Sequence, residues 1–168
     1  PIWVKTDAKD ALLLARLLRI GEITSVVIPS VDQEAARDLV RAREDARADL
    51  TRARHRLSKL LLRHGIVYSG GGAWTGKHDL WLRTEAFAQL TTTAGPTIGV
   101  TFDAHYDAVL AVTARRDRLD DAIEQMAAGS EFTPLVRRLG CLRGIGDLTG
   151  LALAVEIGDW HRFTGRSI

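Results

Sequence analysis

The sequence predicts a mainly α-helical fold in which two long helices with coiled-coil-like spacing pair as an antiparallel hairpin. The stretch from Val31 to His64 contains no glycine or proline, which allows about 50 Å of uninterrupted helix. Its apolar residues recur every seven positions, and those of a second stretch, 101–128, step by three and four. These spacings give each helix an apolar seam. Pairing within the chain and pairing with a second chain both remain open.

Composition narrows the class of protein. Hydrophobic residues make up 46% of the chain, so a folded core is expected rather than disorder. The sequence pI of about 9.1 weakly favours an anionic partner. The single cysteine, Cys141, excludes an internal disulfide framework and fits a reducing compartment. Without a long apolar run or a visible signal peptide, we expect no membrane partner and a cytoplasmic location.

The first predicted helix runs from Asp7 to Arg19 and begins with two carboxylates, Asp7 and Asp10. Side chains at i and i+3 share a helix face, so both can point at the same spot. Such a pair can hold Mg²⁺, and a paired-metal site clamps the oxygens of a phosphodiester. Alternatively, Asp7 is an N-cap and Asp10 favours the helix dipole, which is the commoner role of an isolated D-x-x-D.

After an extended segment at 23–28 and Pro29, Ser30-x-x-Gln33 forms a capping box that opens the long helix. The seam of this helix consists of Leu39, Ala46, Leu50, Ala53, Leu57 and Leu60. Gly65 ends it. A shorter helix at 78–90 and a linker at 91–99 then lead to the second long helix, where His105 and Arg116 interrupt the seam and could fix the register.

Residues 50–78 form a basic zone without a carboxylate. Its cationic candidates for nucleic-acid binding are Arg52, Arg54, Arg56, Lys59, Arg63 and Lys77. A glycine-rich loop, 69–72, and the aromatic residues Tyr68, Trp74 and Trp81 follow the helix, a combination that suits contact with a phosphate backbone and stacking of bases. The alternative is a solvated helix surface. The five histidines show no metal-ligand spacing and are interpreted as surface or seam residues.

Near the C-terminal end, Gly144-Ile145-Gly146 follows an apolar helix end and precedes a second helix with small residues. This order is typical of a helix-hairpin-helix module, in which the amide N–H groups of Gly144 and Gly146 donate hydrogen bonds to a DNA phosphate. Alternatively, the glycines form only a tight turn that packs. Cys141 lies in an apolar context and is expected in the core.

Several motifs, in order along the chain, resemble the DEDD insertion-sequence transposases, which include the bridge-RNA-guided recombinases and the Piv-like DNA invertases. Lys5-Thr6-Asp7-x-x-Asp10-Ala11-x-x-Leu14-Ala15 resembles the last two acidic positions of their RuvC-like nuclease domain. Arg37-Asp38-Leu39 and the long basic helix look like their coiled-coil region. The segment from Gly144 to Asp159 looks like the start of their C-terminal transposase domain.

The resemblance implies an Asp-Glu-Asp-Asp site on a ribonuclease H-like fold, of which Asp7 and Asp10 match the final two positions. It implies an internal fragment with three parts: the end of the nuclease domain at 1–29, the coiled-coil region at 30–130 and the start of the transposase domain at 131–168. The full enzyme would break and rejoin DNA by metal-dependent phosphoryl transfer.

The same resemblance implies further properties of the chain. Mg²⁺ would be held partly by Asp7 and Asp10, and the fragment alone would be inactive. Its expected partners are DNA, a guide RNA if the RNA-guided branch applies, and further copies of itself through the long helices. Its expected location is the bacterial cytoplasm, at the nucleoid. The alternative is a non-catalytic coiled-coil module that binds nucleic acid or assembles a complex.

Overall fold

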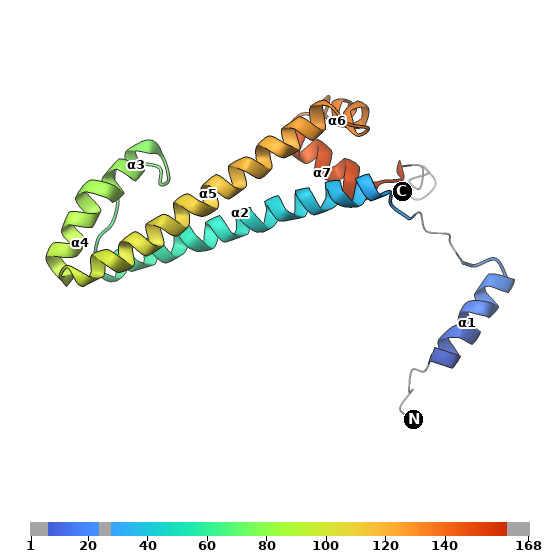
Figure 1. Ribbon diagram of the computed structural model, residues 1–168, viewed down its shortest axis with the longest axis horizontal. Helices are drawn as coiled ribbons and strands as arrows, with labels where there is room; N and C mark the ends of the chain where they lie inside the picture. The colour runs from blue at the N-terminus through green and yellow to red at the C-terminus, as the bar shows by residue number, and fades with distance from the viewer. Residues whose placement is uncertain (1–6, 24–27, 161–168) are drawn as a thin grey trace. The chain divides into compact units, whose positions relative to one another are not determined.

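The computed structural model of the chain describes residues 7–23 and 28–160 (Figure 1). Its elements are α1 (Asp7–Arg19), α2 (Val31–Arg63), α3 (Gly76–Trp81), the π-helical turn η1 (Leu82–Ala86), α4 (Phe87–Ala94), α5 (Thr97–Ala128), α6 (Thr133–Leu139) and α7 (Asp147–Ile157). No strand occurs in these ranges, so the prediction of a mainly α-helical fold is confirmed. Most of the expected extended segment at 23–28 lies outside the described residues.

The chain divides into two compact units, of which one comprises residues 1–30 and 159–168 and the other residues 31–158. The first unit contains α1, which has acidic residues in its first turn and basic residues, Arg16 and Arg19, in its last turn. This distribution complements the helix dipole at both ends. None of the described residues of α1 is buried, and Leu12, Leu14 and Leu18 are exposed.

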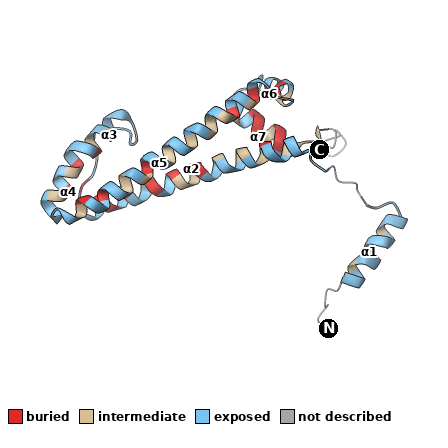
Figure 2. Ribbon diagram, in the orientation of Figure 1, coloured by how far each residue is buried: buried red, intermediate tan, exposed pale blue. Residues whose placement is uncertain are grey.

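In the second unit, α2 and α5 lie side by side and run in opposite directions (Figure 1). Cross-helix ion pairs mark this direction, since Arg43 pairs with Asp120 and Asp49 with Arg115. The predicted seam of α2 is buried at Ala46, Leu50, Ala53, Leu57 and Leu60, and that of α5 at Phe102, Val109 and Ile123. Figure 2 shows these buried positions on the two helices, with exposed residues over their outer faces.

At one end of the α2–α5 pair, α3, η1 and α4 follow one another as an almost continuous helical segment that packs against α2 and α5. The helix expected at 78–90 is therefore longer and contains a π-turn. The linker expected at 91–99 is wrong, because only Gly95 and Pro96 separate α4 from α5. Thr91 and Thr93 fit into α4 because their hydroxyls donate to the carbonyls of Phe87 and Gln89, at 2.9 and 2.8 Å.

At the other end, α6 and α7 pack against each other and against the two long helices. The shared core here contains Ala36, Ile123, Val136, Leu151 and Val155. Gly150 brings α7 close to α6, because a Cβ atom at this position would lie 3.1 Å from Val136 Cγ1. Cys141 is exposed rather than in the core, which corrects the prediction. It follows α6 in the loop, where its sulfur lies 3.5 Å from the carbonyl of Arg137.

Candidate nucleic-acid interface

The acidic pair lies in the first turn of α1, where Asp7 is exposed and Asp10 is half-buried. Carboxylate oxygens at i and i+3 have the right chemistry for Mg²⁺, but they supply only two of its six or so ligands. Within the described ranges, no group of three or more histidine, cysteine, aspartate or glutamate side chains could hold a metal ion. The pair therefore fits part of a metal site, and it equally fits the positive end of the helix dipole.

The basic zone divides into three kinds of cation, of which Arg52 is the first. Its guanidinium pairs at 2.5 Å with Asp49, a residue just before the zone. Asp49 also pairs with Arg115 of α5, and the hydrogen bonds from Arg52 and Arg115 lower the pKa of its carboxyl. Because this carboxylate stays charged beside Arg52, that arginine offers a phosphate less net positive charge than the sequence suggests.

Arg54 is a second kind of cation, because it packs inside the fold. Its guanidinium carbon lies 5.0 Å from the ring centroid of Trp74, and its Nε atom is buried without a hydrogen-bond partner. Burial lowers the pKa of Arg54, and the neighbouring charge of Arg116 lowers it further. This arginine covers an aromatic ring, so part of its charge is turned away from solvent.

The remaining four cations of the zone point into solvent. Arg56, Lys59, Arg63 and Lys77 are all exposed, and none forms an ion pair with a described residue. By contrast, every arginine of α2 from residue 37 to residue 47 bonds to a carboxylate. Among the described residues of α2, the arginine and lysine side chains without a carboxylate partner thus lie in the half of the helix next to α3.

Four rings, those of Tyr68, Trp74, His78 and Trp81, pack together in the loop that follows α2 and in α3. The centroid of His78 lies 4.7 Å from Tyr68, 5.1 Å from Trp74 and 5.5 Å from Trp81. His78 is only 6% exposed, so the prediction of a surface or seam histidine is wrong here. Burial lowers the pKa of His78 more strongly than Asp79 raises it, which favours the neutral imidazole.

The glycine loop between α6 and α7 has Gly144 at φ +89°, and Gly146 is the N-cap of α7. No side chain caps this helix end, which leaves amide groups open at its N-terminus. Asp147 in the first turn already places a negative charge there. Three exposed arginines flank the loop, namely Arg137, Arg138 and Arg143.

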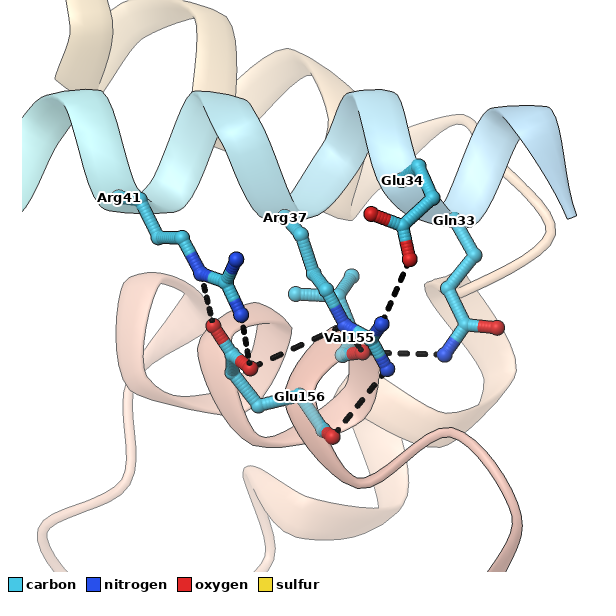
Figure 3. A network of polar contacts seen from close by, with 6 residues as sticks. All are labelled: Gln33, Glu34, Arg37, Arg41, Val155 and Glu156. Carbon is cyan, nitrogen blue, oxygen red and sulfur yellow. Dashed lines mark hydrogen bonds and ion pairs between the residues drawn. The ribbon is translucent and has the colours of Figure 1, made fainter. Parts of the chain in front are cut away.

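A polar network fastens the other end of α7 to α2 (Figure 3). Arg37 Nε and Gln33 Nε2 donate to the carbonyl of Val155 at 2.8 and 3.0 Å. Arg41 donates two bonds to the carboxylate of Glu156, at 2.9 and 3.0 Å. The bonds from Arg37 and Gln33 satisfy a carbonyl that the last turn of a helix leaves open, and those from Arg41 pair with a carboxylate of the same turn. The first arginines of α2 therefore serve the fold rather than a ligand.

Comparison with known proteins relates the sequence of this chain to a family. The family model of the IS110-type DEDD transposases, described as a transposase, matches residues 4–66, which span α1 and α2. The candidate transposase y4qE of Sinorhizobium fredii (strain NBRC 101917 / NGR234) is 33% identical over 160 residues, or 95% of this chain. The chain belongs to the DEDD insertion-sequence transposases.

A second relative has a similar degree of identity. The transposase for insertion sequence element IS1533 of Leptospira borgpetersenii is 33% identical over 159 residues, or 94% of this chain. This chain spans 36% of the length of y4qE and 44% of the IS1533 protein. No solved structure matches it.

The structure brings together only some of the residues that the sequence predicts as site residues. Arg56, Lys59 and Arg63 follow one another along α2, whereas Asp7 and Asp10 belong to the other unit. Sequence reasoning missed Arg137, Arg138 and Arg143 beside the glycine loop, although three arginines within seven residues were a visible signal. It also missed the buried His78, for which the sequence has no signal. None of the described helices is both long and apolar enough to cross a bilayer.

Proposed function

We propose that this chain is the nucleic-acid-binding middle of a transposase that breaks and rejoins DNA strands by metal-dependent phosphoryl transfer. One observation carries the proposal: Arg56, Lys59, Arg63 and Lys77 are exposed and unpaired among the described residues, while the arginines of α2 from residue 37 to residue 47 bond to carboxylates. Lysine and arginine that face solvent without a partner can neutralise phosphates and release counterions. The family membership supports DNA as the ligand.

In this proposal, residues 1–29 end a ribonuclease H-like nuclease domain, and Asp7 and Asp10 supply two of its four carboxylates. When bound, Mg²⁺ would stabilise charge on the attacking and leaving oxygens of the phosphodiester. The first turn of α1 holds both carboxylates on one face of a helix. Because two carboxylates leave most of the coordination sphere open, the chain alone does not cut DNA.

The rest of the chain, residues 30–130 and 131–168, would hold nucleic acid and organise the assembly. The seam of α2 is already filled by α5 of the same chain, so self-association would use the outer faces of these helices. Gly144 and Gly146, with the arginines that flank them, would contact a phosphate backbone. A guide RNA could share the basic face of α2, and the enzyme would act in the bacterial cytoplasm at the nucleoid. For the isolated chain, a non-catalytic binding module is the second candidate, favoured by the absence of a metal cluster among the described residues.

The basic face can be tested by the salt dependence of duplex DNA binding. In the double variant Arg56→Gln with Arg63→Gln, the slope of log affinity against log salt should fall by about 0.9 for each lost phosphate contact. The matched variant Arg47→Gln with Arg118→Gln removes the same charge at exposed positions outside the basic zone, one in α2 and one in α5, and should leave the slope unchanged. Equal slopes in the two double variants would place the DNA on another surface.

The metal role can be tested in a full-length transposase that contains this chain. Asp10→Asn should abolish strand cleavage while the circular dichroism spectrum and melting temperature are retained. Asp32→Asn, which alters an exposed acid in the first turn of α2, is the matched control and should cleave normally. Full cleavage by the Asp10 variant would refute the role of this carboxylate.

A further inference from the structure

A cavity of about 350 Å³ opens beside the ring cluster, between the loop that follows α2 and the segment from α3 to η1. Its volume falls within the range of small-ligand sites, about 300–1,000 Å³. The lining combines two aromatic rings, one cation, one carboxylate and small polar groups. The residues are Tyr68, Ser69, Gly70, Lys77, Leu80, Trp81, Thr84 and Glu85.

The aromatic wall of the cavity is held in place from several sides. The rings of Tyr68 and Trp81 lie 5.0 Å apart, and the buried ring of His78 contacts both. The phenol of Tyr68 lies directly over Gly70, where a Cβ atom would be 2.5 Å from the Tyr68 Oη atom. The cavity therefore has fixed aromatic surfaces before any ligand enters, which lowers the entropic cost of binding.

The backbone around the cavity is irregular at two places. Thr84 and Glu85 belong to the π-turn η1, in which the amide of Phe87 bonds to the carbonyl of Leu82. Such turns are rare and frequently occur at functional sites. Trp74, whose ring contacts His78, has φ +64°, which is costly for a bulky residue and persists only where its surroundings enforce it.

The two charged residues of the lining are separated rather than paired. Lys77 and Glu85 are exposed, and neither forms an ion pair with a described residue. They lie eight residues apart on one helical segment, a separation of about 12 Å along its axis. The cavity thus has a cation, an aromatic wall and a carboxylate that acts only as a hydrogen-bond acceptor.

We propose that this cavity binds one unpaired nucleotide, with its phosphate at Lys77, its base against Tyr68 and Trp81, and the Watson–Crick edge of the base at Glu85. Every base offers a face for stacking on an aromatic ring. Guanine is the preferred base, because its imino and amino N–H groups lie side by side and match the two oxygens of a carboxylate. The assignment rests on the proposed nucleic-acid function and adds to it a site for a single base.

Fluorescence anisotropy of labelled single-stranded octamers provides the test on the full chain. The strands are pyrimidine octamers that carry a central guanine, adenine or abasic residue, each as DNA and as RNA. The guanine strand should bind about tenfold or more tighter than the abasic strand, as expected for one stacked base. The better-binding backbone identifies the natural strand as DNA or RNA.

Three variants assign the contacts within the cavity. Glu85→Gln should reduce the preference for guanine over adenine by about tenfold, whereas Glu124→Gln, an exposed glutamate of α5, should not change it. Lys77→Gln should weaken binding of the guanine strand and of the adenine strand equally. Its control, Arg118→Gln, should change neither. Gly70→Ala should displace the Tyr68 ring and reduce the difference between guanine and abasic strands without changing the salt slope.

The outcomes separate the two proposals. Equal binding of guanine and abasic strands, with binding that still depends on Arg56 and Arg63, would overturn the nucleotide cavity and leave the basic face intact. Absence of salt-dependent binding both to these single strands and to duplex DNA would overturn both proposals. A guanine preference that survives Glu85→Gln in a folded variant, as judged by its melting curve, would overturn the assignment of Glu85.

Discussion

The two ends of the α2–α5 pair use arginine in different ways. At the base, where residues 31–49 of α2 meet α6 and α7, Arg37 and Arg41 bond to the last turn of α7 and Arg43 bonds to Asp120. At the apex, formed by residues 54–94, the exposed cations of α2 have no carboxylate partner among the described residues. In α2, the arginines of the base thus bond within the fold, whereas the exposed cations of the apex remain available to a ligand.

The largest expected effect on stability comes from a substitution in the hydrophobic core of the base. Leu151 of α7 is fully buried against the neighbouring helices. Leu151→Ala therefore leaves a cavity and should lower the free energy of unfolding by about 2–5 kcal/mol. Leu142→Ala, the same change at an exposed leucine of the nearby loop, should stay within about 0.5 kcal/mol of the wild type. Urea denaturation measures both, and equal values would show that α7 adds little to the stability of the base.

The next effect tests whether the base needs its arginines. Arg37 has a side chain only 16% exposed and donates to the carbonyls of Val155 and Glu156. Arg37→Ala leaves these carbonyls without that donor and should lower the free energy of unfolding by about 1–3 kcal/mol. Arg47→Ala is the matched control, because this exposed arginine bonds only to Glu44 one turn away, and its loss should be hard to detect. A larger loss in the Arg47 variant would contradict the comparison.

The C-terminal end of α7 also depends on a glycine. Gly158 has φ +65°, and a Cβ atom there would lie 2.4 Å from the Nε2 atom of Gln33, the second donor to Val155. The polar network at the base, which joins residues more than a hundred positions apart, therefore depends on a backbone conformation at Gly158 that favours glycine.

The helices could be predicted from the sequence, but their polar contacts could not. Glycine-free stretches and heptad spacing are local signals, and they located α2 and α5 within a few residues. Arg37 and Val155 are 118 residues apart, so their bond depends on tertiary packing that no spacing encodes. The same limit applies to Arg54, which packs on Trp74, and Arg56, which is exposed. The two arginines are only two residues apart on one helix, and the sequence does not tell them apart.

The candidate site shows the same limit on a finer scale. Segregation of charge along α2 indicated a basic zone, and Arg56, Lys59, Arg63 and Lys77 are indeed exposed. Pairing of Arg52 with Asp49 and packing of Arg54 on Trp74 depend on rotamers and on the position of the apex loop. The burial of His78 results from three rings that approach it from the loop and from α3, and a sequence motif does not specify that arrangement.

An intermediate effect concerns pH at the apex. The neutral form of His78 is favoured in the folded chain, because burial lowers its pKa below the ordinary value of 6.5. The unfolded chain binds a proton near that value, so the contribution of His78 to stability is complete above it and is lost as the pH falls toward the lowered pKa. The melting temperature should therefore fall more between pH 7 and pH 5 in the wild type than in His78→Phe, which keeps a ring without a titrating group. Parallel curves for the two proteins would exclude His78 as a source of pH dependence.

The smallest effect separates two arginines within the basic zone itself. Arg54 covers Trp74, and the contact between cation and ring is worth about 0.5–1 kcal/mol at such sites. Repulsion from Arg116 and the unsatisfied Nε atom reduce this gain, so Arg54→Gln should lower the free energy of unfolding by at most about 1 kcal/mol. It should leave the salt slope of DNA binding unchanged. Arg56→Gln should do the opposite, with unchanged urea denaturation and a slope reduced by about 0.9. If Arg54→Gln also reduces the slope, the guanidinium that packs on Trp74 leaves that ring to reach the phosphate backbone, and the apex rearranges when nucleic acid binds.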